Sequence, residues 1–167
     1  KAETLYGKRV RTAHVDLLDP AVEQQLEPVL AGYDTVVNIA TAIPRDFSAP
    51  NAWDANTEIR IEGTRRVLNA VLNAGVPNYV QQSITLSYPG LGDEWITEET
   101  PLETNPELAW LWQPVQLMEA QLHAIDPARL KWSILRGGSF IGKDTFQMVT
   151  LDSLKQGAQK IDGEGKA

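Results

Sequence analysis

The chain has 167 residues, 43% of them hydrophobic and 22% charged, which is the composition of a globular domain with one core. Its formal net charge of −7 argues against nucleic-acid binding, because phosphate binding needs clustered lysine and arginine. No apolar run is long enough to span a membrane, and no signal-peptide pattern opens the chain. The absence of cysteine excludes disulfides and thiolate metal sites and suits the reducing cytoplasm, where we expect the protein to reside.

The first predicted elements are a strand and a helix. Segment 9–17 alternates loosely between apolar and polar residues, which predicts a strand followed by a turn. A helix then begins, with Asp19 as its N-cap and Pro20 at the first helical position, and it ends at Gly32. Its apolar stripe consists of Val22, Leu26, Val29 and Leu30.

The next strand is the centre of the predicted fold. Residues 36–40 form a short apolar run rich in β-branched side chains, which favours a strand buried on both faces of a parallel sheet. Small residues follow at Ala40, Thr41 and Ala42, at the carboxyl edge where such sheets bind ligands. Small side chains let a flat ligand lie against the backbone. An ordinary core strand that ends in small residues is the alternative interpretation.

A long helix and a third strand come next. The helix is predicted over 54–74, with Gly63 in its middle permitting a close packing contact. The strand is predicted over 78–84, and the hydroxyl side chains of Ser83 and Thr85 lie at its end. These hydroxyls are candidates for contacting a substrate, although a serine satisfied by neighbouring backbone is an equally good explanation.

The remaining chain contains a loop, two helices and a strand. Residues 88–108 are rich in Pro, Gly, Glu and Thr and predict a long substrate-side loop. Pro114 is expected at the first position of the next helix. A strand is predicted over 131–135 with a turn over 136–138, followed by a short helix over 151–156. Strands alternating with helices at this spacing predict an α/β fold, a doubly wound parallel sheet with helices on both faces.

Several short motifs carry a resemblance to a known family. They are Asp16-Leu17-Leu18-Asp19, residues 36–42, Asn56 with residues 63–68, Ser83 near residues 88–90, residues 99–101, Glu119 and residues 135–142. In order and spacing they resemble the extended short-chain dehydrogenase/reductases, the NAD-dependent epimerase/dehydratase group with its atypical members. The resemblance covers nearly the whole chain, and it implies a single, partial NAD(P)-binding Rossmann-like domain over residues 1–167.

The resemblance also implies how a cofactor, NAD or NADP, would be held. Asp16 and Leu17 would face the adenine, with the Asp16 carboxylate accepting from its exocyclic amine. Residues 40–42 would lie along the dinucleotide, and Asn56 would support the strand ends. Arg136, in the last of the motifs, is the remaining cofactor-binding candidate.

Two departures from the family pattern stand out. No glycine-rich phosphate loop occurs in the sequence, so we expect an internal fragment that lacks the first βαβ unit. The family's catalytic Tyr-x-x-x-Lys pair is also missing, because Glu119 aligns Leu111 and Val115 with its positions. A shift of the alignment by one residue gives Trp112 and Gln116, and neither of these side chains can exchange a proton as the Tyr/Lys pair does.

The sequence therefore predicts an NAD(P)-binding oxidoreductase or epimerase/dehydratase relative. Its substrate would be a small carbonyl, alcohol or nucleotide-sugar-type molecule, with Ser83 and Thr85 as the catalytic candidates. The alternative is a non-catalytic member of the family, either an NAD(P)-sensing regulator of the NmrA type or an assembly subunit. A homodimer or a complex with an assembly partner is expected, and His14 and His123 lie too far apart in sequence to suggest a metal site.

Overall fold

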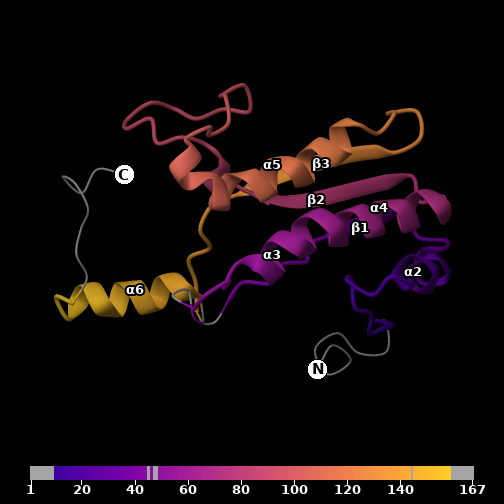
Figure 1. Ribbon diagram of the computed structural model, residues 1–167, viewed down its shortest axis with the longest axis horizontal. Helices are drawn as coiled ribbons and strands as arrows, with labels where there is room; N and C mark the ends of the chain where they lie inside the picture. The colour runs from indigo at the N-terminus through magenta and orange to yellow at the C-terminus, as the bar shows by residue number, and fades with distance from the viewer. Residues whose placement is uncertain (1–9, 45, 47–48, 144, 159–167) are drawn as a thin grey trace. The chain divides into compact units, whose positions relative to one another are not determined.

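The computed structural model describes residues 10–44, 46, 49–143 and 145–158 (Figure 1). In chain order the elements are α2 (Val22–Leu30), β1 (Thr35–Asn38), α3 (Asp54–Glu58), the π-helical turn η2 (Ile59–Gly63), α4 (Thr64–Asn73), β2 (Asn78–Ile84), the 3₁₀ turns η3 (Thr85–Ser87) and η4 (Pro106–Leu108), α5 (Ala109–His123), β3 (Lys131–Gly137) and α6 (Phe146–Lys155). None of the helices described is long and apolar enough to cross a membrane.

The three strands form one sheet in the order β1-β2-β3. β1 and β2 are parallel, with Thr35 opposite Asn78 and Asn38 opposite Gln81. The backbone N–H of Lys131 donates to the carbonyl of Pro77 at 3.1 Å, so β3 begins beside the start of β2. Strands that begin side by side run in the same direction, and the predicted α/β fold with a parallel, Rossmann-like sheet is confirmed.

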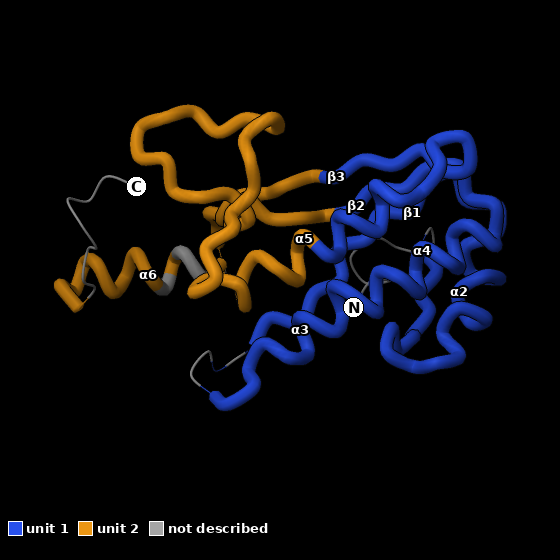
Figure 2. Tube along the Cα trace, turned by 45° about the horizontal axis from the view of Figure 1, so that its top comes forward, with its two compact units in different colours: residues 1–81, 117–134 blue, residues 82–116, 135–167 orange. Residues whose placement is uncertain are grey.

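The chain divides into two compact units, coloured separately in Figure 2. Unit 1 consists of residues 1–81 and 117–134, and unit 2 of residues 82–116 and 135–167. The expectation of a single domain over 1–167 stays a prediction.

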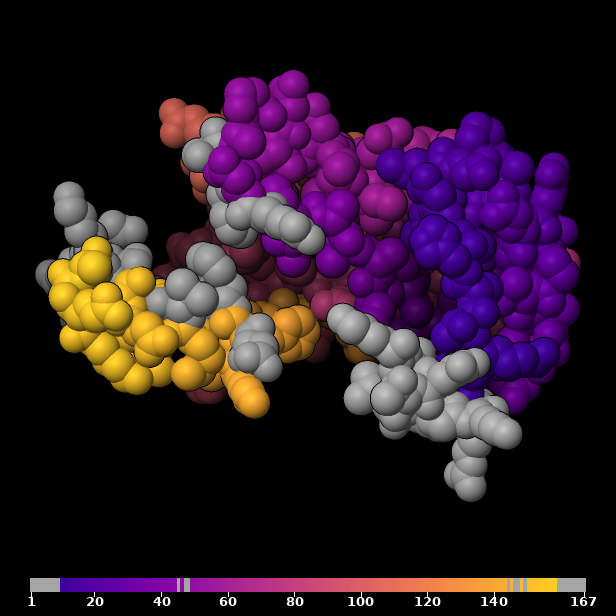
Figure 3. Space-filling model, turned by 90° about the horizontal axis from the view of Figure 1, so that it is seen from below, coloured from indigo at the N-terminus to yellow at the C-terminus, as the bar shows by residue number. Residues whose placement is uncertain are grey.

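The hydrophobic core of unit 1 forms where α2 packs against α4. The core is made by Val22, Leu26, Val67, Leu68, Ala70, Val71, Val76, Tyr79, Leu122 and Leu130. In the space-filling view of Figure 3 the indigo atoms of the early chain gather on one side of this unit. The predicted stripe of the first helix is confirmed for its buried members, while Val29 remains 41% exposed.

Polar side chains along the edge of the same helix pair fix how α2 lies on α4. Glu23 accepts hydrogen bonds from Asn69 at 3.1 Å and from Arg65 at 3.4 Å, and Asn73 donates to Glu27 at 2.7 Å. These groups are partly exposed, so each contributes only a few tenths to about 1 kcal/mol to stability. Their combined effect is to select one alignment of two helices that apolar packing alone would leave less well defined.

Two predictions about the strands were wrong. Residues 10–16 form no strand, because the sheet takes its three strands from later segments and a strand needs a hydrogen-bonded neighbour. β1 is not buried on both faces, since Val37 is 59% exposed while Val36 packs on the core. An apolar run shows that a strand is favoured, but it does not show which of its faces other elements cover.

Three predicted boundaries were also wrong. The first helix starts at Val22, two residues after Pro20, although the Asp19 carboxylate still accepts from the Ala21 N–H at 2.8 Å. Pro114 lies inside α5, because the helical segment begins earlier, where Asn105 caps the turn that Pro106 opens. β3 extends to Gly137, so the turn expected over 136–138 does not start at Arg136.

The predicted helix over 54–74 and the predicted strand over 78–84 are confirmed. The helix runs from Asp54 to Asn73 and contains one π-helical turn, and it ends before Gly75, whose φ is +69°. Gly63 is buried, and a methyl group added there would lie 3.5 Å from Cβ of Leu17. That distance is ordinary van der Waals contact, so the position is close-packed without excluding alanine.

We therefore expect Gly63→Ala to raise the free energy of unfolding by about 0.5–1 kcal/mol, because Gly63 has helical dihedral angles and glycine loses more backbone entropy on folding. Urea denaturation followed by circular dichroism measures the change. Gly75→Ala is the matched control, and its left-handed backbone predicts a loss of roughly 1 kcal/mol. Destabilisation by both substitutions would show that the methyl group at position 63 does not fit beside Leu17.

Candidate functional site

The small residues after β1 are held from two sides. The Ala40 N–H donates to Oδ1 of Asn38 at 3.1 Å, and Nδ2 of Asn56 donates to the Thr41 hydroxyl oxygen at 2.9 Å. Thr41 itself is exposed, whereas Asn56 is buried. The backbone that follows the strand is thereby fixed, and Thr41 remains an exposed residue.

Asn56 is in turn held by Arg60, one helical turn further along the chain. Nε of Arg60 donates to Oδ1 of Asn56 at 2.9 Å, and its Nη1 lies 4.0 Å from the sulfur of Met118. Burial lowers the pKa of the Arg60 guanidinium, and the negative charge of Glu119, which is only 2% exposed, acts in the opposite direction. Sequence reasoning missed Arg60, although the spacing of Asn56 and Arg60 places both on one helix face.

A buried polar network joins β1 to β2 directly below this segment. Nδ2 of Asn38 donates to the Tyr79 oxygen at 2.9 Å and to Oε1 of Gln81 at 3.1 Å, and the Tyr79 hydroxyl donates to that Oε1 at 2.7 Å. Burial raises the pKa of the Tyr79 phenol well above its usual value, with the hydrogen bond from Asn38 opposing the shift. The network therefore holds Tyr79 as a neutral donor.

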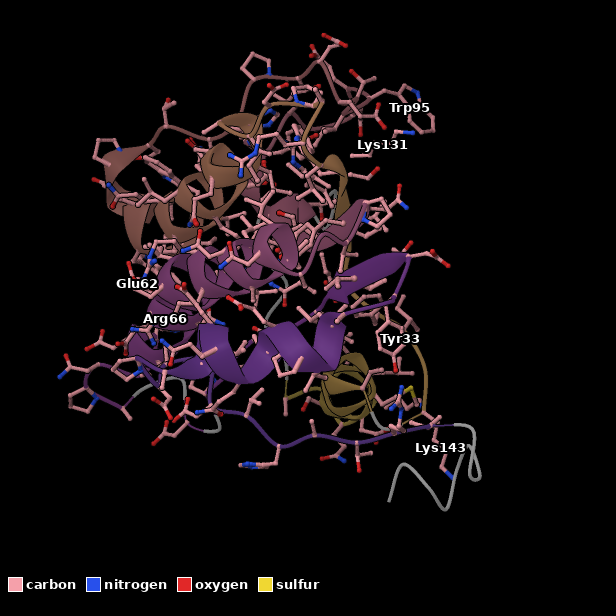
Figure 4. The ribbon with its side chains drawn as sticks, turned by 90° about the vertical axis from the view of Figure 1, so that its right-hand side faces the viewer. Tyr33, Glu62, Arg66, Trp95, Lys131 and Lys143 are labelled. Carbon is pink, nitrogen blue, oxygen red and sulfur yellow. The ribbon has the colours of Figure 1, made fainter. Side chains whose placement is uncertain are left out.

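Asp16 and Leu17 form a tight turn tied to α4. Oδ1 of Asp16 accepts from the Leu18 N–H at 2.9 Å, and the Leu17 carbonyl accepts from Arg66 at 3.1 Å. Figure 4 labels Arg66 and Glu62, which come from neighbouring turns of the same helix. The second Asp16 oxygen, Oδ2, makes no hydrogen bond to the residues that the structure describes, so it is available to a ligand on this exposed turn.

Ser83, Thr85 and Arg136 belong to unit 2. Ser83 is fully buried and Thr85 is exposed at the start of η3. A methyl group placed on Gly138 would lie 3.8 Å from the Thr85 hydroxyl oxygen, so the residues after β2 lie beside Gly138, which directly follows β3. Arg136 donates to the Tyr88 hydroxyl at 2.5 Å, and its guanidinium carbon is 5.0 Å from the centre of that ring.

The residues at the positions of the missing catalytic pair have structural partners. Trp112 donates to the Asn105 carbonyl at 2.9 Å, and Gln116 donates to the Glu103 carbonyl at 2.7 Å. Val115 is 1% exposed and fills the interior beside Pro114, which is also buried. Both alignments with the family's Tyr-x-x-x-Lys pair thus place non-titrating side chains at these positions. Trp112 and Gln116 hold the long loop, and Val115 fills the interior.

The structure brings Thr41 and Asn56 into contact and ties the Asp16–Leu17 turn to the same helical segment. The roles assigned to the nine candidate residues stay predictions. Within the described part of the chain, no group of three or more His, Asp and Glu side chains is arranged to hold a metal ion.

No family model and no curated protein sequence matches the chain significantly. Solved structures do. The chain is similar to the UDP-Glc/GlcNAc 4-epimerase of Campylobacter jejuni, with 17% identity, a TM-score of 0.67, and coverage of 94% of this chain and 50% of that one. It is also similar to a dTDP-glucose 4,6-dehydratase, DesIV of Streptomyces venezuelae, with 24% identity, a TM-score of 0.65, and coverage of 93% and 48%.

A third similar structure is the UDP-glucose 4-epimerase of Bifidobacterium longum in complex with NAD⁺ and UDP, with 25% identity, a TM-score of 0.59, and coverage of 80% and 39%. The chain spans about half the length of the solved structures it matches. The resemblance to the NAD-dependent epimerase/dehydratase group of short-chain dehydrogenases/reductases is thus confirmed at the level of the fold.

We expect Tyr79→Phe to lower the free energy of unfolding by about 1–2 kcal/mol at neutral pH, because it removes one donor and one acceptor from the buried network. Urea unfolding measures the loss. Tyr33→Phe, at a 47% exposed tyrosine, is the control and is expected to change stability little.

The same pair tests the pKa shift of Tyr79. An unfolded tyrosine ionises near pH 10, roughly its ordinary pKa, while the folded Tyr79 keeps its proton to higher pH. The stability that neutral Tyr79 contributes is therefore fully present below about pH 10 and declines above it. The difference between wild type and Tyr79→Phe should shrink as pH rises through that value. A difference that grows would contradict the assignment.

Proposed function

We propose that the protein binds a nicotinamide dinucleotide along residues 40–42 and belongs functionally with the short-chain dehydrogenases/reductases. The observation that carries the proposal is the segment after β1, where small residues are fixed by Asn38 and Asn56 and Thr41 is exposed. The fold supports it, because parallel α/β sheets bind ligands at the carboxyl ends of their strands. Two of the structures that resemble this chain, DesIV and the Bifidobacterium longum epimerase, were solved with NAD bound, which supports the binding of NAD or NADP.

The residues present fit part of a dinucleotide. Oδ2 of Asp16 offers the adenine amine an acceptor on an exposed turn, beside the half-buried Leu17. Ala40, Thr41 and Ala42 offer a surface without bulky side chains. We assign Asn56 the support of this segment. Arg136, in unit 2, is proposed as a cofactor-binding residue from the family resemblance alone.

The substrate is proposed to be a small carbonyl, an alcohol or a nucleotide sugar. One solved neighbour, WbmG of Bordetella bronchiseptica, is a complex with NAD and UDP, and others are named as epimerases of UDP-sugars. A bound nicotinamide accepts or donates hydride. Ser83 and Thr85 would donate hydrogen bonds to the substrate oxygen at the end of β2, and Thr85 is the more accessible of the two. A cytoplasmic location, and a homodimer or an assembly partner, complete the proposal.

A second candidate function is dinucleotide sensing or a structural role without turnover. It is favoured by the contacts of Trp112 and Gln116, which hold loop carbonyls where the family has its titrating pair. Proton exchange with a substrate needs a group of suitable pKa at that position, and neither side chain can supply one.

Isothermal titration calorimetry of the full-length protein with NAD and NADP tests the binding proposal. We expect saturable binding of NAD, reduced at least tenfold in Ala42→Leu because the larger side chain occupies the ligand's place. Ala128→Leu, at an exposed alanine in the turn before β3, should bind as the wild type does. Undiminished binding by Ala42→Leu would place the cofactor elsewhere, and no binding by the wild type would end the proposal.

Oxidation of NADH or NADPH across a panel of carbonyl compounds and nucleotide sugars distinguishes the two functions. If the protein is an enzyme, Ser83→Ala and Thr85→Ala should each lower kcat by tenfold or more, since each removes a donor to the substrate oxygen. Thr104→Ala, at an exposed threonine of the long loop, is the control. Turnover that survives both substitutions removes these hydroxyls from the mechanism, and binding without any turnover supports the sensing role.

A further inference from the structure

Arg60 lies in the one π-helical turn that the structure describes, between α3 and α4. In this turn the Thr64 N–H donates to the carbonyl of Ile59, five residues earlier, and also to the carbonyl of Ile61. Gln121 on α5 holds the turn, since its side-chain amide donates to the Ile61 carbonyl at 3.0 Å. Its own Oε1 is buried and has no partner among the described residues, so the amide is oriented by that single bond.

The Arg60 guanidinium determines which way the Asn56 amide faces. A guanidinium is only a donor, so the atom of Asn56 that contacts Nε of Arg60 at 2.9 Å must be the oxygen, Oδ1. The amide nitrogen, Nδ2, then faces the Thr41 hydroxyl at 2.9 Å. Nδ2 is only a donor, so the Thr41 oxygen accepts, and the hydrogen of its own hydroxyl points away from Asn56.

We propose that Arg60 is a positioning residue that makes the exposed Thr41 hydroxyl a hydrogen-bond donor toward an acceptor oxygen of the bound dinucleotide. This inference rests on the proposed function. It adds the direction of one hydrogen bond, which runs from the Thr41 hydroxyl to the ligand. Without Arg60 the Asn56 amide is able to turn over, and its oxygen would then accept the Thr41 hydrogen. Thr41 would present only lone pairs to an acceptor atom of the ligand, and that hydrogen bond would be lost.

The surroundings of Arg60 favour this arrangement. Met118 lies 4.0 Å from its Nη1, and the buried carboxylate of Glu119 supplies a compensating negative charge. Burying a guanidinium costs free energy unless its charge is compensated. The charge of Glu119 provides that compensation, so Arg60 can remain partly buried beside the Asn56 oxygen. Arg65, on the same helical segment, differs: it is exposed and pairs with Glu23 and Glu62 at the surface.

The test is calorimetry with NAD on the full-length protein. Thr41→Val and Arg60→Met should each weaken NAD binding by about tenfold, the loss of one hydrogen bond. The double variant should be no weaker than Thr41→Val alone, because both substitutions remove the same bond. Asn56→Asp should give the same loss, since its carboxylate keeps Arg60 as a partner and takes the Thr41 hydrogen. Thr41→Ser should bind nearly as the wild type does, and Arg65→Met is the matched control that leaves affinity unchanged.

Arg60→Met removes a positive charge that acts on the buried Glu119, so it is also made with Glu119→Gln, and urea unfolding shows whether each variant folds. If neither folds, Asn56→Asp carries the test. Additive losses in the Thr41 and Arg60 double variant, or unchanged affinity in Arg60→Met and Asn56→Asp, would overturn the inference.

A ligand-independent readout separates this inference from the proposed function. In NMR spectra of the wild type, the Asn56 amide protons should show nuclear Overhauser contacts to the Thr41 side chain, and these contacts should disappear in Arg60→Met. If the wild type binds no NAD but shows this change, the cofactor proposal fails and the orientation of Asn56 by Arg60 stands. If NAD binds and the contacts are missing from the wild type or unchanged in the variant, the role of Arg60 is refuted and the cofactor proposal stands.

Discussion

The parallel pairing of β1 with β2 is the constraint on which unit 1 depends. Its register places Asn38 opposite Gln81, and their side chains meet Tyr79 in one buried network. A shift of one residue would turn Asn38 to the exposed face and leave buried polar groups without partners, each at a cost of about 1–3 kcal/mol. The network therefore opposes other registers more strongly than the surrounding apolar residues can, because apolar contacts are not directional.

The same register determines where the candidate site lies. Asn38 is the last residue of β1, so the network that fixes the strand also fixes the segment after it, through the Ala40 N–H. Thr41 then meets Asn56, and Asn56 meets Arg60 in the following helix. Each hydrogen bond in this series has a fixed donor and a fixed acceptor. The exposed Thr41 therefore has its hydroxyl hydrogen free to donate to a ligand. A floor for a flat ligand needs small side chains, and it also needs polar groups that present the right atom.

Much of the fold could be predicted from the sequence, where signals were local. Residues 78–84 form a strand because they follow a left-handed glycine and alternate in burial from Tyr79 onward. Pro114 predicts too late a start for α5, because Asn105 and Pro106 carry the same N-terminal signal eight residues earlier. The exposed face of Val37 could not be read from the strand itself, because burial depends on what packs against a residue.

The part of the candidate site that has local sequence signals was predictable. Small residues after a strand are visible in the sequence, and so was Asn56, but the importance of Arg60 depends on Met118 and Glu119, far away along the chain. Nothing in local spacing predicts that a buried carboxylate will accompany a particular arginine. Contacts of this kind are the main thing that a structure adds to a correct assignment of elements.

A crystal structure of the full-length protein grown with NAD would show directly whether the cofactor binds at the end of β1. We expect the dinucleotide to lie over residues 40–42, with its adenine amine at the Asp16 carboxylate and the Thr41 hydroxyl donating to one of its oxygens. A dinucleotide bound away from the end of β1, or a side chain filling the place above Ala40 and Ala42, would contradict it.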